Sequence, residues 1–395
     1  MKSPNLPSTR SDEMIQQEEI AMEDTTTTAE DNVYFDSYED IEIHRLMLKD
    51  VPRTEAYQKA ILGNKQLFEG KVVMDIGAGT GILSLFCAQA GAAKVYAVEA
   101  SRLANLTREV VAKNGFSHVI EVVHGKAEEI DLPEGVQVDV IVSEWMGFYL
   151  LHESMLESVL LARDKHLKPD GVMLPSKATL FAAACRLGEF YSQQVDFWNH
   201  LYGLDLSPVG QAVLDSKRCK PEVAIVKADE LLSEPVQLAD FDLAWLGPDE
   251  IERIHSRAFT SVLCDQPTEY QGVCLWFDCS FEWPDQTPCT PVKLSTSPSS
   301  AATHWKQTII VLPSSIQVEE GDLIGWELTL KRSMEHRRRY QIELNLLDPE
   351  EDEHPVPCSC GQARCVVIAA FMAKADEEPL PDDDVDVSAG QSSVI

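Results

Sequence analysis

The sequence predicts an α/β domain built on a parallel sheet, followed by a domain of antiparallel strands that form a β-barrel or sandwich. From Val72 to about Pro175, short apolar runs alternate with stretches whose apolar residues have helical spacing. This pattern is typical of a parallel sheet covered by helices on both faces. After Pro175, strand-like runs punctuated by proline and glycine dominate, which indicates antiparallel strands. A chain of 395 residues is long enough for both domains.

The chain carries a large negative charge. Its formal net charge is −32 at pH 7, and the acidic segments 1–32 and 374–395 contribute −12 of it. Such a field opposes the binding of nucleic acid and accelerates the encounter with cationic partners at low salt, although acidity can also serve solubility alone. We therefore expect no direct nucleic-acid partner.

Two further features of the composition bear on location. The sequence has no run of about 18 apolar residues, and its first 30 residues lack the apolar segment of a secretory signal. We therefore expect neither a membrane span nor secretion. The ten cysteines are scattered, which fits reduced thiols in the nucleus or the cytoplasm.

The segments before the sheet are expected to form a tail and a lid. Residues 1–32 are polar and acidic, so we expect a disordered tail. Residues 33–70 are expected to form a helical lid, with one helix at Ile41–Leu48 and a second that is capped by Thr54 and runs to about Leu67.

The remaining expected elements follow the same patterns. In the α/β domain, residues 71–176, a strand begins at Val72, and further strands are expected at Val95–Val98, Val119–Val123, Val138–Val142 and Val172–Leu174, with helices at Ile82–Ala90, Leu103–Lys113 and Ser154–Lys168. In the β domain, residues 177–373, a helical stretch is expected at Glu189–Tyr202 and strands at Ala258–Leu263, Val273–Phe281, Thr308–Leu312, Leu323–Leu330, Tyr340–Leu347 and Val366–Met372. Residues 374–395 are expected to form a second disordered tail.

A glycine-rich turn follows the first strand. The stretch Asp75-Ile-Gly77-Ala-Gly79-Thr-Gly precedes a helix that begins near Ile82, and the second strand ends at Glu99. The two glycines allow a ligand to approach the backbone, and Glu99 can accept both ribose hydroxyls. A dinucleotide is disfavoured, because Ile82 is bulky and Asp75 would repel phosphate. S-adenosylmethionine has an adenosine, a sulfonium and an ammonium group without phosphate and fits these residues; a glycine turn in another kind of α/β protein is the alternative.

Two glutamates flank a loop directly after a later strand. Glu144 and Glu153 bracket an aromatic, glycine-containing segment, residues 145–152. A lone acid at such a position is most often a helix cap, but two acids beside a cofactor pocket are costly unless they meet a cation. The cation that two carboxylates bind bidentately is a guanidinium. The pair therefore predicts a site for an arginine side chain.

These motifs together resemble those of the protein arginine N-methyltransferases. The glycine loop with Glu99, the segment Ser143–Glu153 and the segment Thr303–Gln307 are similar to that family's cofactor loop, double-glutamate hairpin and THW loop. The segment Tyr34–Tyr38 is similar to its N-terminal aromatic motif. The resemblance covers most of the chain and points in particular to the type I enzymes with a single core, such as the nuclear sixth member and its insect relatives. It implies a Rossmann-like S-adenosylmethionine-dependent methyltransferase domain, followed by an antiparallel β-barrel with a helical dimerisation arm at about 190–220.

The resemblance also implies catalytic roles for four residues. Glu144 and Glu153 would localise the positive charge of the substrate guanidinium on two of its nitrogens, so that the third nitrogen can attack the methyl group. His304 would pair with Asp50, and this pair would receive the released proton or buttress the site. A purely structural histidine is the alternative for His304.

Binding contacts are implied in the same way. The expected cofactor contacts are Phe35, His44, Arg53, Asp75, Gly77, Gly79, Glu99, Glu128 and Met155. Among them, Arg53 would pair with the methionine carboxylate, Asp75 would face the ammonium group and Phe35 would cover the adenosine. The expected substrate contacts are Tyr38, Met47 and Trp305. Met47 and Met155 match the methionines that line the arginine pocket of asymmetrically dimethylating enzymes, which favours type I.

The implied function is the transfer of methyl groups from S-adenosylmethionine to arginines of basic proteins, such as histone tails and Gly-Arg-rich proteins, by a homodimer. The sequence departs from the family near the substrate entrance, where Arg45 and Leu46 replace the usual acidic pair and Phe148 replaces tyrosine. These departures leave open a weakly active or inactive member that acts as a binding scaffold. A small-molecule methyltransferase would share the glycine loop but not the double-glutamate hairpin with the THW loop.

Four potential metal ligands lie in a short run outside these motifs, at His354, Cys358, Cys360 and Cys365. Such a set could hold zinc. The C-x-C-x₄-C spacing, however, lacks the usual C-x₂-C knuckle, and the run resembles a final barrel strand. We therefore expect no metal in the functional site, and zinc binding by this run stays an open alternative.

Overall fold

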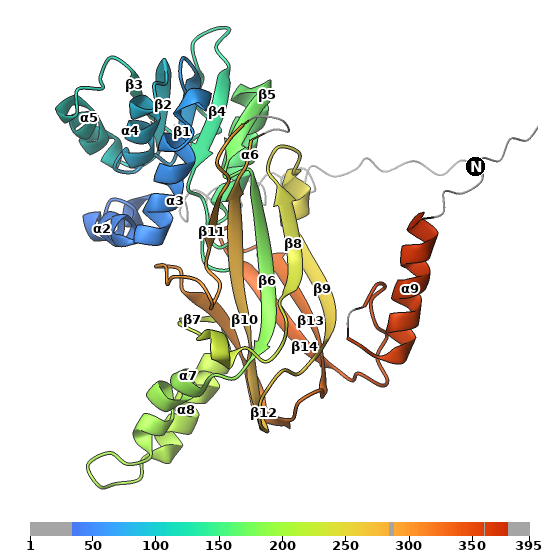
Figure 1. The fold of residues 1–395 in the computed structure, drawn as a ribbon. Coiled ribbons are helices and arrows are strands. Elements are labelled where there is room, and N and C mark those ends of the chain that lie inside the picture. Colours follow the sequence, from blue (N-terminus) through green and yellow to red (C-terminus); the bar gives the residue numbers. More distant parts are fainter. Residues whose placement is uncertain (1–33, 284–287, 359, 378–395) are drawn as a thin grey trace, which may run out of the picture.

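The computed structural model describes residues 34–283, 288–358 and 360–377. An α/β domain forms one end of the molecule and an elongated β domain extends from it, as Figure 1 shows. The expected tail at 1–32 and all but the first four residues of the tail at 374–395 lie outside the described residues. Among the helices that are described, none has the length and apolar character needed to cross a membrane.

Two helices precede the parallel sheet, as expected. They are α2 (Ile41–Lys49) and α3 (Val51–Leu62), followed by the short helix η1 (Lys65–Leu67). The cap of the second helix is Asp50 rather than the predicted Thr54, because the Asp50 carboxylate accepts a hydrogen bond from the Arg53 backbone N–H at 3.1 Å. Pro52 lies in the first helical turn, where no backbone donor is needed, and so begins the helix rather than interrupting it.

The α/β domain is a five-stranded parallel sheet with helices, which confirms the predicted fold class. Its strand order is β3-β2-β1-β4-β5, and its elements are β1 (Val72–Ile76), α4 (Ile82–Gln89), β2 (Lys94–Glu99), α5 (Leu103–Lys113), β3 (Ile120–His124), β4 (Val138–Ser143), α6 (Met155–His166) and β5 (Leu167–Leu174). In register, Asp75 of β1 lies opposite Ala97 of β2 and Val142 of β4. The segments that follow these three strands therefore leave the sheet at the same edge, where ligands bind in open α/β sheets.

The β domain consists of two antiparallel sheets. One has the order β7-β12-β10-β6-β8, with β11 paired to β10, and the other has the order β14-β13-β9. The strands are β6 (Lys177–Cys185), β7 (Glu222–Ala224), β8 (Val236–Asp242), β9 (Arg253–Ser261), β10 (Thr268–Phe281), β11 (Val292–Ser295), β12 (Gln307–Val318), β13 (Leu323–Arg332) and β14 (Tyr340–Leu347). The predicted strands between residues 258 and 347 all fall on strands of this domain. The alanine-rich β6 was not expected, because its buried position between β10 and β8, not its propensity, makes it a strand.

A helical arm extends from the β domain. It contains α7 (Gly188–Gln194), η2 (Asp196–Trp198) and α8 (Ser207–Arg218), and in Figure 1 it projects away from both sheets. The predicted helix at Glu189–Tyr202 covers its first half, and α8 lies in the second half of the helical arm that the family resemblance implied at about 190–220.

The last predicted strand is wrong. Residues Val366–Met372 belong to helix α9 (Ala363–Glu377), which also includes Lys374, where a disordered tail was expected to begin. A short apolar run fits either a strand or one side of a helix. In the part of the chain that the structure describes, the run pairs with no strand, and Val367 and Phe371 on α9 are 67% and 75% exposed.

Candidate active site

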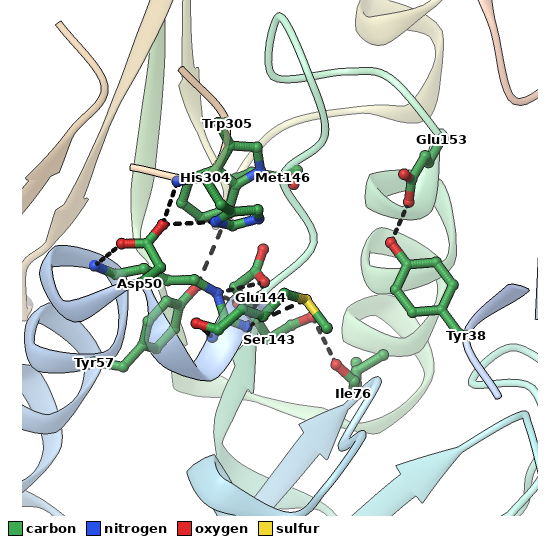
Figure 2. Close-up of polar contacts among 12 residues, drawn as sticks. Tyr38, Asp50, Tyr57, Ile76, Ser143, Glu144, Met146, Glu153, His304 and Trp305 are labelled. Carbon is green, nitrogen blue, oxygen red and sulfur yellow. Dashed lines mark hydrogen bonds and ion pairs between the residues drawn. The ribbon is translucent and has the colours of Figure 1, made fainter. Parts of the chain in front are cut away.

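The structure contains a cavity of about 300 Å³ where the carboxyl ends of the parallel strands meet the N-terminal helices and the β domain. Figure 2 shows part of its polar lining. The predicted site residues that line the cavity are Phe35, Tyr38, His44, Met47, Arg53, Gly77, Gly79, Glu99, Glu128, Glu144, Glu153, Met155, His304 and Trp305. Residues far apart in the sequence are thus brought to one site.

The glycine loop forms the floor of the cavity. Gly77 and Gly79 have φ angles of +73° and +54°, a region that side chains rarely adopt. A Cβ atom on Gly77 would also lie 2.5 Å from the Cε atom of Met155, so the end of that side chain would have to move. Both carboxylate oxygens of Glu99 accept backbone N–H bonds, from Gly79 and from Ser101, each at 2.8 Å. Glu99 is therefore held at the tip of β2 beside the loop.

Asp75 does not line the cavity, so its predicted contact with a ligand ammonium group has no geometric support. Its side chain is fully buried below the loop and accepts a hydrogen bond from the Ser84 hydroxyl at 2.6 Å. Burial raises the pKa of the Asp75 carboxyl to about 6, although the hydrogen bond from Ser84 opposes this shift. The structure shows Asp75 fastening β1 to α4.

Glu144 is paired with Arg53. The Arg53 guanidinium donates to one Glu144 oxygen from Nε at 2.8 Å and from Nη2 at 2.5 Å, and both side chains are 9% exposed. A third donor, Nη1, reaches the Met47 carbonyl at 3.3 Å. One member of the predicted carboxylate pair is thus held by a guanidinium of the chain itself, while Arg53 still lines the cavity.

Glu153 lies across the cavity on a strained loop. Its φ angle is +75°, and its backbone N–H donates to the Arg338 carbonyl at 2.8 Å. The Tyr38 hydroxyl donates to its carboxylate at 2.6 Å, as Figure 2 shows. Burial and the negative charge of Glu144 raise the pKa of the Glu153 carboxyl, and the hydrogen bond from Tyr38 opposes them. A cationic ligand beside Glu153 would offset the unfavourable burial of its negative charge, so the site favours such a ligand.

The β domain closes the cavity through His304 and Trp305. One oxygen of Asp50 accepts hydrogen bonds from the His304 backbone N–H at 2.7 Å and from its Nδ1 at 2.6 Å. Burial alone would raise the pKa of the Asp50 carboxyl, but the hydrogen bonds from His304 and Arg53 lower it. Trp305 donates from its indole to the Met146 carbonyl at 2.8 Å. The pair that was predicted from the family resemblance is therefore formed, although Asp50 itself does not line the cavity.

The sequence reasoning missed Arg338. This residue lines the cavity, donates to the Glu153 carbonyl at 3.0 Å, and places its guanidinium 3.9 Å from the ring centre of Tyr34. The only sequence signal was the run Arg337-Arg338-Arg339 in the β13–β14 turn. Of the three departures from the family pattern, Leu46 and Phe148 line the cavity, whereas the exposed Arg45 pairs with Glu42 at 3.0 Å.

The arrangement suits a reaction on a flat cation. Four glutamates, Glu99, Glu128, Glu144 and Glu153, line a cavity whose remaining lining is largely aromatic and apolar, and in such surroundings charge pairs act more strongly than in water. The glycine loop and Glu99 provide a neighbouring position for a nucleoside. The site can therefore hold a guanidinium beside a nucleoside-bearing cofactor.

Comparison with known proteins points to one family. Residues 73–171 match the family described as a methyltransferase domain, and residues 176–347 match the arginine methyltransferase oligomerization subdomain. The chain is 40% identical over 346 residues to the probable protein arginine N-methyltransferase 6.1 of Oryza sativa subsp. indica. The aligned region covers 82% of this chain and 90% of the rice protein. It is 39% identical over 334 residues to protein arginine N-methyltransferase 6 of Danio rerio, which spans 83% and 92% of the two chains. A solved structure, the Trypanosoma brucei PRMT1 enzyme–prozyme heterotetrameric complex with AdoHcy, superposes with a TM-score of 0.69 at 32% identity and covers 82% of this chain and 97% of that one.

Proposed function

The chain belongs to the protein arginine N-methyltransferase family, and on this premise we propose that it is a type I enzyme, which forms monomethyl and asymmetric dimethyl arginine on basic proteins. The observation that carries this proposal is the pair Glu144 and Glu153 facing one cavity beside the glycine loop. The methyl donor is S-adenosylmethionine, consistent with the AdoHcy bound to the Trypanosoma relative.

The cavity fits this cofactor on its own residues. When bound, S-adenosylmethionine supplies an electrophilic methyl group on a sulfonium. Gly77 and Gly79 leave the floor of the cavity without side chains, and the Glu99 carboxylate stands at the end of β2, where a ribose is expected. Arg53 lines the same cavity and is the residue that would hold the cofactor carboxylate.

The carboxylates act on the substrate. A guanidinium spreads its charge over three nitrogens and is a poor nucleophile. Glu144 and Glu153, on opposite sides of one nitrogen pair, would draw that charge toward two nitrogens and orient the third. The nitrogen that gains a methyl group loses a proton, and Glu153 is suited to take it, because its pKa is raised.

We assign His304 and Asp50 to buttressing. Asp50 caps α3, which carries Arg53, and the same carboxylate binds His304 of the β domain. The pair therefore fixes the position of Arg53, and through it Glu144, against the THW loop. Removing it should loosen the cavity without removing a proton acceptor.

Met47 supports the type I assignment. Its sulfur lies 3.9 Å from Arg53 Nη2, and the residue lines the cavity close to Glu144. In the family the symmetric enzymes have a bulkier phenylalanine at this position, so the methionine leaves room for a second methyl group on the same nitrogen.

Basic peptides are the proposed substrates, in particular histone tails and Gly-Arg-rich segments. The net charge of −32 favours their approach, and the scattered cysteines favour action in the nucleus or the cytoplasm. We further propose a homodimer that uses the helical arm, whose residues Phe197, Tyr202 and Leu204 are 53%, 96% and 66% exposed.

Mass spectrometry of the products tests the proposal. The purified chain is incubated with S-adenosylmethionine and a Gly-Arg-rich peptide, and the same peptide with lysine in place of arginine is the control. We expect monomethyl and asymmetric dimethyl arginine on the first peptide only. Symmetric dimethyl arginine would refute the type I assignment, and the absence of any methylated arginine on Gly-Arg-rich and histone peptides would refute the activity.

A further inference from the structure

A cluster of four potential metal ligands lies outside the active-site cavity, in the segment after strand β14 and in the first turn of helix α9. His354, Cys358, Cys360 and Cys365 each present one donor atom, and all four atoms lie within 4.8 Å of one another. None of these residues lines the cavity. The cluster is therefore not explained by methyl transfer.

The three sulfurs converge on one ring nitrogen. The Sγ atoms of Cys358, Cys360 and Cys365 lie 3.5, 3.4 and 3.3 Å from His354 Nδ1. The other ring nitrogen, Nε2, lies 3.0 Å from the Pro349 carbonyl. Because a carbonyl only accepts, the ring proton is on Nε2 and Nδ1 has a bare lone pair.

Hydrogen bonds to His354 alone do not account for the convergence of three sulfurs on its Nδ1 atom. One lone pair accepts one S–H donor, so two of the three thiols would have no partner at Nδ1. A tetrahedral zinc ion with Zn–N and Zn–S bonds of about 2.0 and 2.3 Å would place each sulfur about 3.5 Å from the nitrogen. The observed separations are close to this value. The four residues also match the Cys₃His ligand set of structural zinc sites.

The surroundings hold the ligands in place. The His354 ring stacks on Phe259 of β9 at 3.7 Å with an interplanar angle of 4°, and its Nε2–H bond to a backbone carbonyl is the outer contact that metal-bound histidines usually make. The Ser261 hydroxyl of β9 donates to the Cys360 carbonyl at 3.0 Å. Cys360 and Cys365 are 2% and 4% exposed. The fold therefore holds the four side chains in position, and two of them, Cys360 and Cys365, are shielded from solvent.

We propose that His354, Cys358, Cys360 and Cys365 bind one zinc ion, and that this ion fastens the segment after β14, together with α9, to the edge strand β9. Three thiolates and a neutral imidazole give the zinc-bound site a net charge of −1, and sulfur-rich tetrahedral sets select zinc over magnesium and calcium. Four protein ligands complete the coordination. The ion is thus structural and takes no part in methyl transfer.

Metal analysis of the full chain tests the proposal directly. The protein is expressed in zinc-supplemented medium and purified with reductant and without chelator, and its metal content is measured by mass spectrometry. We expect about one zinc per chain. Cys360→Ser and Cys365→Ser should each reduce the zinc content to background, whereas Cys219→Ser, at an exposed cysteine beside α8, should leave it unchanged.

A second measurement does not depend on the variants' folding. The wild-type chain is loaded with cobalt in place of zinc, and its absorption spectrum is recorded. Tetrahedral thiolate coordination predicts intense visible bands and a sulfur-to-cobalt charge-transfer band, both lost on addition of zinc. Three results would each overturn the proposal. The first is a zinc content well below one per chain together with the absence of thiolate bands, the second is zinc that persists in both serine variants, and the third is a disulfide within the cluster of the freshly purified protein.

Discussion

Replacing Glu153 by glutamine tests the paired-carboxylate mechanism at the carboxylate whose ionised form is disfavoured by burial and by the charge of Glu144. Glutamine keeps the shape of the side chain and an oxygen that can accept the hydrogen bond from the Tyr38 hydroxyl, which lies 2.6 Å from the Glu153 carboxylate in the wild type. It removes only the charge. The substitution therefore separates electrostatic stabilisation of the guanidinium from simple filling of the cavity.

The magnitude follows from the position of the charge. A carboxylate and a guanidinium about 4 Å apart at an effective dielectric constant of about 20 interact by about 4 kcal/mol. Glutamine retains part of this through one hydrogen bond, so we expect a loss of about 3 kcal/mol in the transition state, or roughly a hundredfold to a thousandfold in kcat. Because the buried Glu153 charge and its repulsion by Glu144 disappear, the folded state should be no less stable than wild type.

The assay combines turnover with two further measurements, cofactor affinity and thermal stability. We expect kcat on a Gly-Arg-rich peptide to fall roughly a hundredfold to a thousandfold. Cofactor affinity, measured by calorimetry, should be unchanged, and the melting temperature should be unchanged or raised. Wild-type kcat should also fall as the pH drops through the raised pKa of Glu153, because only the ionised carboxylate stabilises the guanidinium. Glu109→Gln, at an exposed acid on α5, is the matched control. A kcat within threefold of wild type would refute the mechanism, and a parallel loss of cofactor affinity would assign Glu153 to cofactor binding instead.

Three further predictions concern stability and assembly. The buried Asp75 carboxyl has a pKa of about 6 against an ordinary value of 3.8, so between these pH values the folded chain binds a proton that the unfolded chain does not. The free energy of unfolding should therefore fall by up to about 3 kcal/mol as the pH rises through this range. Chemical denaturation at pH 4.5 and pH 7 should show this fall in the wild type and not in Asp75→Asn. Serine at Phe197, Tyr202 and Leu204 should convert a dimer into monomers in sedimentation without lowering the melting temperature of the β domain, and a monomeric wild type would refute the role of the arm. The kcat/KM for a basic peptide should fall as salt rises from about 10 mM to about 500 mM, because salt screens the field, and a salt-independent value would show that the net charge does not steer the substrate.

The α/β domain was predictable because its local and tertiary signals agree. Strands buried on both faces read as continuous apolar runs, and β1 and β4 show this directly. The signals disagree elsewhere. Helix α8 buries only two of its residues, Gly210 and Leu214, and it was expected only through the family resemblance, as part of the helical arm. Helix α9 presents the opposite problem, because its run is apolar but largely exposed, with Val367 and Phe371 67% and 75% exposed, so the apolar pattern suggested a buried strand that does not form.

The candidate site was predictable wherever chemistry follows directly from a strand end. Gly77, Glu99 and Glu144 meet because parallel strands bring their carboxyl ends to one edge. Asp50 and His304 are 254 positions apart, and no periodicity links them, so their pairing came only from the family resemblance. The four ligands of the cysteine cluster were visible in the sequence because they lie in one short run, residues 354–365, but their convergence on one point depends on how the chain folds back after β14 against Phe259.

The sequence also presents Glu144 and Glu153 as equivalent, and the structure shows that they are not. Glu144 accepts two hydrogen bonds from the Arg53 guanidinium, so much of its charge is compensated before a substrate arrives. The pKa of Glu153 stays raised even though the Tyr38 hydroxyl and the charge of Arg338 lower it. An arriving guanidinium therefore gains more from Glu153, where it relieves an uncompensated charge, than from Glu144, where it competes with Arg53. Within the mechanism proposed above, Glu144 would then be mainly an orienting group, and Glu153 would contribute the larger share of the charge localisation that leaves one nitrogen free to attack.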